Sequence, residues 1–363
     1  MNLPSYTIGV TAYDSVKSVC PIYGKKVVAI GGKTAIGKAR ALIEQAADEA
    51  GLMINEFIWY GGEASYENME MLKAMPSVQE ADMIFAIGGG RAMDTCKLLA
   101  HTIGKPFFTF PTIASNCACL TGLSVIYHPD GTFRELVPSN IPPVHSFIYL
   151  PIAAEAPVQY LWAGMGDTIA KYYEASLSGR NMRLEHFNAL GIEISRLCTE
   201  PILNYGTKAL QDNKIHAASW EFEQVVLAII VTTGLVSNFV EPDLNGHIAH
   251  ALYSTITMLP QIEEKHLHGE VVAYGVLVLL MCDKQQEELA KVFAFCRAIG
   301  LPTCLADLDV TLPEMERVLD ETVKNGELVR SPYLITKELL RDAVLQLEEY
   351  HKRGCFSRSF NSH

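Results

Sequence analysis

The chain of 363 residues has few charged side chains and no cluster of basic ones. Charged residues make up 19% of the sequence, and the formal net charge is -12. Nucleic-acid-binding surfaces need Lys and Arg gathered on one face, so this composition argues against a nucleic-acid partner. Apolar residues make up 49% of the sequence, enough for a large buried core, and the length suits two domains.

The first 20 residues lack the pattern of a secretory signal, because no basic start is followed by an apolar run. Two strongly apolar stretches occur, over 225–240 and 271–282. The first contains Thr, Gly, Ser and Asn, and the second is short for a membrane span. We therefore expect two buried helices, no membrane partner and a cytoplasmic location.

The nine cysteines are scattered and lack the paired spacing of a zinc ribbon. Cys117 and Cys119 form the only close pair, and no second pair follows downstream. We expect reduced thiols, which are the rule in cytoplasmic proteins.

The first 150 residues alternate short apolar runs with helical patterns. Strands are predicted over 26–30, 57–60, 83–87 and 107–110, and helices over 35–50, 66–74 and 90–101. This order predicts a parallel sheet with helices on its faces. Later strands are expected over 124–127 and 147–150, with a hairpin turn at 129–131.

Strand patterns end near Pro151, and long helical patterns interrupted by prolines follow. No internal repeat is present. The sequence therefore predicts an α/β fold with a parallel-sheet domain over 1–155 and an all-helical domain over 156–353. The last ten residues, 354–363, show no clear periodicity and are predicted to form a flexible tail.

Three consecutive glycines, Gly88, Gly89 and Gly90, follow a predicted strand and open a helix. Glycines let a backbone approach a pyrophosphate, and the helix N-terminus offers free N–H groups to it. The run is not the Gly-x-Gly-x-x-Gly fingerprint, and a turn that only joins strand to helix is the competing interpretation. Lys97, two turns into the helix, is either a solvated charge or reaches this site.

Asp167, His250 and His268 form a candidate set of three metal ligands. Two imidazoles and one carboxylate suit a divalent metal and leave a position open for water or substrate. Each residue has an alternative: Asp167 suits a helix N-cap, and His247 or His266 could replace its neighbour. The flanking glycines favour a site, because packing around a small ion needs small neighbours. The spacing alone does not select His250 over His247.

Seven segments in this order are similar to the iron-containing alcohol dehydrogenase superfamily, and within it to the glycerol dehydrogenase-like branch. They are VVAIGGKTAIGKA from Val27, GGGRAMDTCK from Gly88, FPTIAS from Phe110, LSVIY from Leu123, APVQYLWAGMGDTIAKYYEA from Ala156, HIAHAL and HLHGE. The resemblance covers the chain to about residue 350.

The resemblance implies a Rossmann-like N-terminal domain that binds nucleotide and a helical C-terminal domain that binds metal. This is the architecture of dehydroquinate synthase-like and group III alcohol dehydrogenases. It implies Zn²⁺, or Fe²⁺, held by the catalytic residues Asp167, His250 and His268, together with NAD or NADP. The metal would lower the pKa of a substrate hydroxyl, and the nicotinamide would exchange hydride with it. The implied cofactor-binding residues are Gly88, Gly89, Gly90, Arg91, Ala92, Thr112, Ser115, Thr121, Leu123 and Tyr127.

One position departs from the glycerol dehydrogenase pattern. Cys117 stands where the resemblance implies an aspartate that contacts the hydroxyls of a polyol. A thiol is a poor acceptor for two hydroxyl donors, and its lack of charge would tolerate a substrate carboxylate. A 2-hydroxy or 2-oxo acid is thus the expected substrate, as in bacterial hydroxycarboxylate dehydrogenases, and glycerol is the alternative. Lys171 is the nearest cation for such a carboxylate, or else a solvated residue.

Two other functions remain open. A dehydroquinate synthase-like lyase would need a glutamate as third ligand and several basic residues, and a non-catalytic nucleotide-binding relic would not need an intact ligand set. NAD and NADP are equally open, because Gly31, Gly32 and Lys33 stand where a ribose-binding acid is usual. Self-association into a homo-oligomer is implied by the resemblance only.

Overall fold

The computed structural model describes residues 3–139 and 141–359, which form two compact units. The first unit comprises Met1–Leu161 and Lys208–Asn238, and the second comprises Trp162–Thr207 and Phe239–His363. Residues 208–238 thus belong with the sheet-bearing unit, although the helical pattern alone groups them with the second half. The division into a nucleotide domain and a metal domain at residue 155 stays a prediction.

A six-stranded parallel sheet, in the order β1-β8-β5-β4-β2-β3, forms the centre of the first unit. The strands are β1 (Ser5–Gly9), β2 (Lys26–Gly31), β3 (Met53–Trp59), β4 (Met83–Gly88), β5 (Phe107–Pro111) and β8 (His145–Tyr149). The predicted parallel sheet is confirmed. The prediction missed β1, because this edge strand is largely exposed and has no buried apolar run to mark it.

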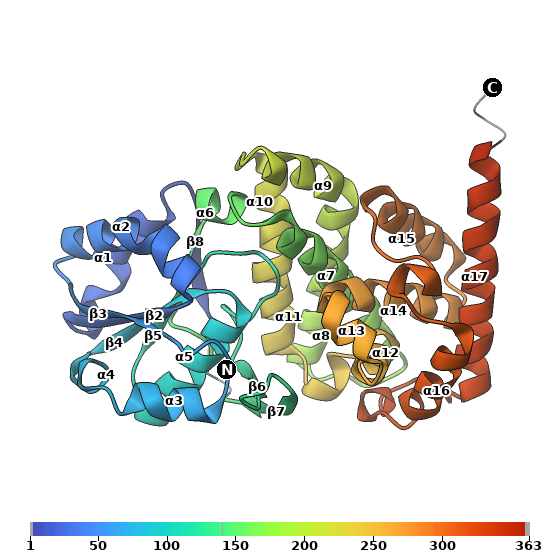
Figure 1. Cartoon of the computed structure of the whole chain (residues 1–363), viewed down its shortest axis with the longest axis horizontal. Coiled ribbons are helices and arrows are strands. Elements are labelled where there is room, and N and C mark those ends of the chain that lie inside the picture. The colour runs from blue at the N-terminus through green and yellow to red at the C-terminus, as the bar shows by residue number, and fades with distance from the viewer. Residues whose placement is uncertain (1–2, 140, 360–363) are drawn as a thin grey trace. The chain divides into compact units, whose positions relative to one another are not determined.

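Helices cover both faces of this sheet (Figure 1). One face packs against α1 (Val16–Val19) and α2 (Lys33–Glu49), with a core that includes Ile43, Phe85 and Phe108. The other face carries α3 (Tyr66–Lys73), α4 (Pro76–Glu80) and α5 (Gly90–Ile103). Strand β4 is buried along its whole length, as expected for a strand covered on both sides.

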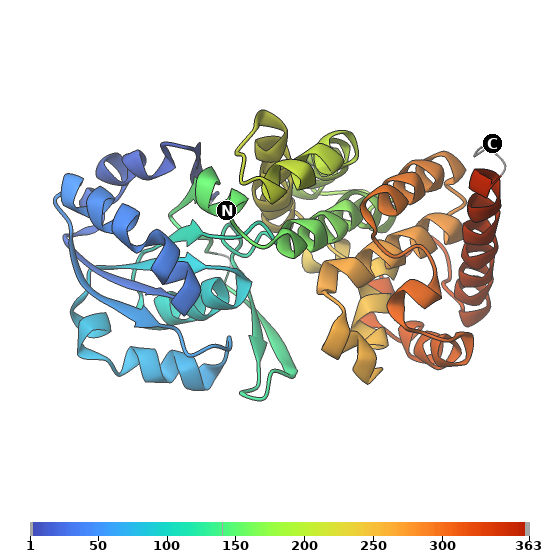
Figure 2. The same cartoon turned by 45° about the horizontal axis from the view of Figure 1, so that its top comes forward.

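A separate antiparallel hairpin joins β6 (Leu123–Tyr127) to β7 (Phe133–Pro138). Figure 2 shows this hairpin as a two-stranded ribbon apart from the main sheet. Gly131 adopts a φ of +88° in the connecting turn, where its N–H donates to the carbonyl of His128. The predicted hairpin turn at 129–131 is therefore confirmed. Helix α6 (Leu150–Ala154) follows β8.

The second unit is helical throughout its described residues. Its helices are most of α7 (Val158–Ser178), α8 (His186–Ile194), part of α9 (Arg196–Lys214), α12 (Ile248–Ile256), α13 (Pro260–Lys265), α14 (His268–Cys282), α15 (Gln286–Ile299), α16 (Leu312–Thr322) and α17 (Lys337–Ser359). Helix α14 is buried along almost its whole length.

Helix α17 continues to Ser359, further than the sequence pattern indicated, and the flexible tail over 354–363 stays a prediction. A single glycine inside a helix costs only about 1 kcal/mol, so Gly354 does not end a helix that the preceding turns propagate. Residues 360–363 lie outside the described part of the chain.

The apolar stretch near residue 230 forms α10 (Trp220–Val226), a π-helical segment (Leu227–Thr232) and α11 (Thr233–Phe239). In the described chain it is the one helix long and apolar enough to cross a membrane, and 61% of its most apolar window is buried within the protein. Both apolar stretches thus form largely buried helices, as predicted.

Candidate metal and nucleotide sites

The backbones of α7 and α14 touch at two glycines, one beside each of two candidate ligands. A Cβ on Gly166 would lie 2.2 Å from the carbonyl oxygen of Gly269, and a Cβ on Gly269 would lie 1.9 Å from the carbonyl oxygen of Ala163. Any larger residue would therefore force the helices apart. This close approach places Asp167 of α7 beside His268, the first residue of α14.

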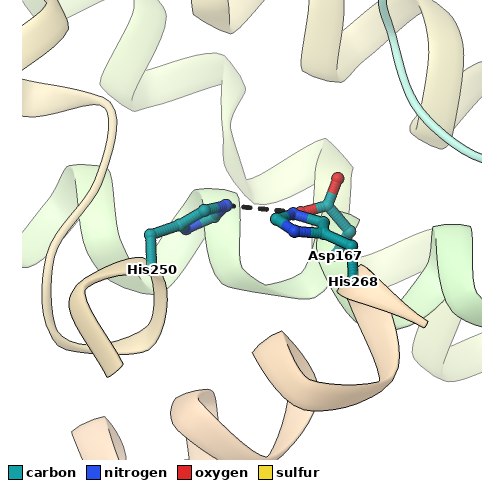
Figure 3. A group of neighbouring side chains, drawn as sticks. All are labelled: Asp167, His250 and His268. Carbon is teal, nitrogen blue, oxygen red and sulfur yellow. Dashed lines mark hydrogen bonds and ion pairs between the residues drawn. The ribbon is translucent and has the colours of Figure 1, made fainter. Parts of the chain in front are cut away.

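The structure brings Asp167, His250 and His268 together, each from a different helix (Figure 3). Asp167 Oδ1 lies 3.3 Å from His250 Nε2 and 3.1 Å from His268 Nε2. The three ligand atoms all lie within 4.8 Å of one another. His268 keeps 45% of its side chain exposed, against 16% for Asp167, so the cluster is open on the His268 side.

This geometry fits a divalent metal. Zinc bonds of about 2.0–2.1 Å in a tetrahedral arrangement place neighbouring ligand atoms about 3.3 Å apart. The two separations from the Asp167 oxygen, 3.1 and 3.3 Å, match that spacing. Three protein ligands also leave one tetrahedral position for water or substrate, which is the pattern of catalytic rather than structural zinc. The donor set suits Fe²⁺ as well.

A fourth residue, Glu174, supports the cluster from behind. It lies two helical turns after Asp167 on α7, and its side chain is fully buried. Its Oε2 lies 2.5 Å from His250 Nδ1, and its Oε1 accepts the backbone N–H groups of His247 and His250 at 2.8 and 2.9 Å. With a metal on Nε2, the Nδ1–H of His250 donates to Glu174, which fixes the tautomer and the ring orientation.

One sequence signal points to Glu174, its spacing of seven residues from Asp167 on one helix. That spacing places both carboxylates on the same face of α7. The carboxylate also lies at the N-terminus of α12, where negative charge is favourable.

At this cluster, the attraction between opposite charges shifts the pKa values more than burial does. Burial lowers the pKa of His250, but the Glu174 and Asp167 carboxylates raise it well above 6.5. Burial raises the pKa of Asp167, but the His268 and His250 imidazoles hold it well below 3.8. The pKa of Glu174 is lowered from 4.5 against the effect of burial, mainly by His250. Both carboxylates are therefore ionised at neutral pH, and the site attracts a cation.

The two neighbouring histidines lie outside the cluster. His247 is fully buried, and neither ring nitrogen has a hydrogen-bond partner among the described residues. His266 Nδ1 lies 2.9 Å from a carboxylate oxygen of Glu270. The structure thus selects His250 over His247 and His268 over His266 as members of the three-residue group, a choice that spacing alone left open.

The glycine turn combines a strained backbone with an uncapped helix. Gly88 has a φ of +142°, which side chains rarely adopt, and a Cβ there would lie 3.2 Å from that of Ala92. Gly89 is the N-cap of α5 and provides no side-chain cap to the first turn. The N–H groups of Gly90, Arg91 and Ala92 therefore start a 14-residue helix without a capping side chain, a usual arrangement for binding phosphate.

Most of the other predicted cofactor residues surround this turn within the first unit. The Thr112 N–H, just after β5, donates to the Gly88 carbonyl at 3.1 Å. Arg91 bonds Glu63 at 3.1 Å, and its guanidinium lies 5.3 Å from the ring of Tyr127. These residues lie at the carboxyl ends of neighbouring parallel strands or beside them, where α/β sheets bind ligands. For Ser115 the structure adds only that it is half-buried.

Lys97 joins the turn helix to the segment that carries Thr121 and Leu123. It is fully buried, and its ammonium donates to Asp94 Oδ1 at 3.0 Å, to Thr121 Oγ1 at 3.4 Å and to the Leu123 carbonyl. The suggestion of a solvated surface charge is therefore wrong. The buried pair of Lys97 and Asp94 holds two predicted cofactor contacts against α5, and sequence reasoning missed Asp94.

Cys117 lies beside the glycine turn in the first unit. It is half-buried, and the preceding Asn116 packs so closely on Gly90 that a Cβ there would lie 2.8 Å from the Asn116 amide nitrogen. Lys171 is buried, so the alternative of a solvated residue is wrong. Its ammonium donates to the carbonyl oxygen and side-chain oxygen of Asn245 at 3.2 and 2.9 Å.

Comparisons with known proteins identify the family to which the chain is similar. A model of the family "iron-containing alcohol dehydrogenase" matches residues 4–147. The chain is 34% identical to hydroxycarboxylate dehydrogenase A of Escherichia coli K12 over 330 residues, which are 90% of each chain. It is 32% identical to glycerol dehydrogenase of Escherichia coli O6:H1 over 335 residues, 89% of each chain.

The fold agrees equally well. The crystal structure of glycerol dehydrogenase from Schizosaccharomyces pombe aligns with a TM-score of 0.87 at 25% identity, covering 100% of this chain and 93% of that one. The matches extend across both units, whereas the family model alone matches only the first part of the chain. By its similarity to these relatives over nine-tenths of its length, the chain belongs to the iron-containing alcohol dehydrogenase family and is an oxidoreductase of the alcohol or hydroxyacid dehydrogenase type.

Proposed function

We propose that this oxidoreductase holds a zinc ion with Asp167, His250 and His268 and interconverts a small 2-hydroxy acid and its 2-oxo acid. The observation that carries the proposal is the convergence of the three side chains, with the two separations from the Asp167 oxygen matching tetrahedral zinc. Fe²⁺ is the alternative metal, and NAD and NADP are both compatible with the chain.

The protein side chains of the metal site have separable roles. When bound, the metal would act as a Lewis acid on the alcohol or carbonyl oxygen. Asp167 supplies the negative charge of the ligand set, and His250 is held in one tautomer by Glu174. His268 is the most exposed member, so a substrate would reach the cluster from its side.

The glycine turn would hold the nicotinamide nucleotide, which supplies or accepts the hydride. The uncapped N–H groups of α5 would bind its pyrophosphate, and Gly88 and Gly89 keep side chains away from the path of the backbone. Lys97 would act indirectly, by fixing Thr121 and the Leu123 carbonyl against α5.

The proposed substrate rests on Cys117. A thiol in place of a carboxylate removes an acceptor for polyol hydroxyls and a charge that would repel a substrate carboxylate. One relative carries the name hydroxycarboxylate dehydrogenase, at 34% identity, and supports this choice. Glycerol is the second candidate, because glycerol dehydrogenases are nearly as similar, at 32 and 33% identity.

The test is a direct assay of nicotinamide absorbance with the metal-reconstituted protein. Oxidation of glycerol with NAD⁺ or NADP⁺ is compared with reduction of a panel of small 2-oxo acids with NADH or NADPH, each in the presence of Zn²⁺ or Fe²⁺. We expect turnover with one or more 2-oxo acids and little with glycerol. Efficient glycerol oxidation would replace the proposed substrate by the polyol, and absence of turnover in every combination would contradict the proposed reaction.

We further infer that the active form is a cytoplasmic homo-oligomer acting on a small molecule, as expected from the family resemblance. Light scattering on the purified protein measures the mass of the particle directly. A mass of 40.0 kDa, that of a single chain, at assay concentrations would contradict the oligomer.

A further inference from the structure

A second cluster of metal-ligating side chains lies in the second unit, formed by Cys304, Asp307 and His351. One ligand atom from each lies within 4.8 Å of the others. Cys304 is the N-cap of the short 3-10 helix Leu305–Leu308, Asp307 is the third residue of that helix, and His351 belongs to α17. None of these residues belongs to the Asp167 cluster. The two groups are the only ones of this kind among the described residues.

The donor types are those of a zinc site. Thiolate, imidazole and carboxylate are all zinc ligands, with bonds of about 2.0–2.3 Å that put neighbouring donor atoms about 3.3–3.7 Å apart. The donor atoms lie within 4.8 Å of one another, so binding a zinc ion would need them to close by at most about 1.5 Å. Thiolate also favours zinc over the harder cations Mg²⁺ and Ca²⁺.

Hydrogen bonds already fix two of the three side chains. Asp307 Oδ2 accepts the backbone N–H groups of Thr303 and Cys304 at 2.8 and 3.3 Å. The Thr303 hydroxyl donates to the same oxygen at 3.3 Å and lies 2.9 Å from His351 Nδ1. In that arrangement the Nδ1–H of His351 donates to the Thr303 hydroxyl, which ties the imidazole to the same group as Asp307.

An unsatisfied hydroxyl nearby is an independent sign of a missing ligand. Tyr274 is fully buried, and its hydroxyl has no hydrogen-bond partner among the described residues. The charges of Glu348, Cys304 and Asp307 lie close enough to add to the effect of burial and raise its pKa. Buried hydroxyls are nearly always hydrogen-bonded, and a water on a metal in this cluster would supply the partner.

We propose that Cys304, Asp307 and His351 bind a zinc-like divalent metal that ties the segment after α15 to the C-terminal helix. The proposal is independent of the proposed reaction, because these residues are not part of the dehydrogenase site. Cysteine binds a metal as the thiolate, so binding would release the proton of the Cys304 thiol to solvent.

Cobalt substitution distinguishes the two metal sites, because only this second site contains a sulfur ligand. The full-length protein is stripped with a chelator and titrated with Co²⁺. We expect two equivalents to bind, with a thiolate-to-cobalt charge-transfer band in the near ultraviolet. His268→Ala should lose one equivalent and keep the band, whereas Cys304→Ser should lose the band and keep dehydrogenase activity.

Two further variants keep the test decisive if Cys304→Ser folds poorly. His351→Gln and Asp307→Asn are close in size to the native residues, and circular dichroism monitors their folding. Each should weaken binding of the second equivalent by more than about 100-fold, since changes behind a ligand alone cost about 10–100-fold. Cys117→Ser is the matched control and should keep the band.

Three results would overturn the proposal. They are a spectrum without a thiolate band, a band that survives in Cys304→Ser, and a single equivalent of bound cobalt that is lost in His268→Ala. A band lost in Cys117→Ser instead would assign the sulfur ligand elsewhere. The dehydrogenase activity of Cys304→Ser is only a control, so a failure of the proposed reaction leaves the cobalt readouts unaffected.

Discussion

The glycine turn and the histidine cluster illustrate two ways of building a binding site. The turn is one continuous segment, from Gly88 with its positive φ to Ala92 in the uncapped first turn of α5. Its binding groups are backbone N–H groups. The cluster is assembled from α7, α12 and α14, and its donors are side chains as much as 101 residues apart. The turn depends on the conformation of a few residues, and the cluster depends on helix packing.

The supports of the two sites differ in the same way. Behind the turn, the buried pair of Lys97 and Asp94 fixes a neighbouring segment through its charge and hydrogen bonds. Behind the cluster, Glu174 fixes a ligand directly, by bonding the Nδ1 of His250. Changes to the first site should therefore act on nucleotide affinity, and changes to the second on metal affinity. Five predictions test this separation, in order of expected effect.

Replacing His268 should have the largest effect. His268→Ala leaves two protein ligands, and a bound metal supplies several kcal/mol of transition-state stabilisation, so turnover should fall at least about a thousandfold. The side chain is 45% exposed, so the fold should survive. Metal analysis, steady-state rates and circular dichroism measure the three quantities. His266→Gln, two residues away, should keep metal and activity, and a metal-free His268→Ala with full activity contradicts the mechanism.

Replacing Gly88 should weaken nucleotide binding without loss of metal. An alanine at a φ of +142° costs about 1–3 kcal/mol, so the turn should relax and the Kd of the nucleotide should rise about 5–150-fold. Fluorescence titration with the reduced nucleotide measures it. Gly104→Ala is the matched control, since Gly104 ends the same helix with a φ of +67° and open space around it. An unchanged Kd in Gly88→Ala would show that the turn does not bind nucleotide.

Glu174→Gln should weaken metal binding by about 10–100-fold, the usual cost of losing the group behind a ligating histidine. The amide keeps the size of the side chain but not its charge. Competition with a calibrated chelator gives the affinity, and saturating metal should restore most of the turnover. Glu288→Gln is the control, because Glu288 also bonds a residue of α7, Tyr173, but lies outside the cluster. Equal metal affinity in wild type and Glu174→Gln would reduce Glu174 to a purely structural role.

Cys117→Asp should shift substrate preference by about tenfold or less, because it adds one hydrogen-bond acceptor and one charge. The ratio of glycerol oxidation to 2-oxo acid reduction should rise. Measuring kcat/KM for both substrates gives the ratio, and Cys119→Ser provides a control for the general effect of changing this segment. An unchanged ratio would mean that Cys117 does not set the substrate preference.

The smallest effect concerns the stability of the metal-free protein. Because the pKa of His250 is raised in the folded state, its charge interactions stabilise the folded protein fully below pH 6.5. This stabilisation is lost as the pH rises through the raised pKa. Because the pKa of Glu174 is lowered in the folded state, its charge interactions stabilise the folded protein above pH 4.5. This stabilisation is lost as the pH falls through the lowered pKa.

The difference in Tm between wild type and Glu174→Gln should therefore be greatest between pH 4.5 and 6.5 and shrink at high pH. Its size should be about 1 kcal/mol, or about 2–4 °C, since a charged hydrogen bond exceeds a neutral one by roughly that amount. Thermal unfolding in chelator across this pH range measures it. A difference that grows steadily towards high pH would contradict the assigned charges.

Local pattern was sufficient for much of the first unit. Alternating apolar runs and helical periods identified β2, β4, β5 and the glycine turn, because each is specified by neighbours in sequence. Strand β1 was not predicted, because this exposed edge strand has no apolar pattern. The last turns of α17 were not predicted either, because helix propagation depends on the preceding turns rather than on the periodicity of the last residues.

The sequence by itself determined the α/β class, the position of the glycine turn and the residue types of a metal site. Family resemblance added Asp167, His250 and His268 as a set. Tertiary structure decided what spacing could not: that His250 rather than His247 faces Asp167, that Glu174 supports it, and that Lys97 is buried. The physical reason is that two helices touch at Gly166 and Gly269, and such a contact between residues distant in sequence has no local signature.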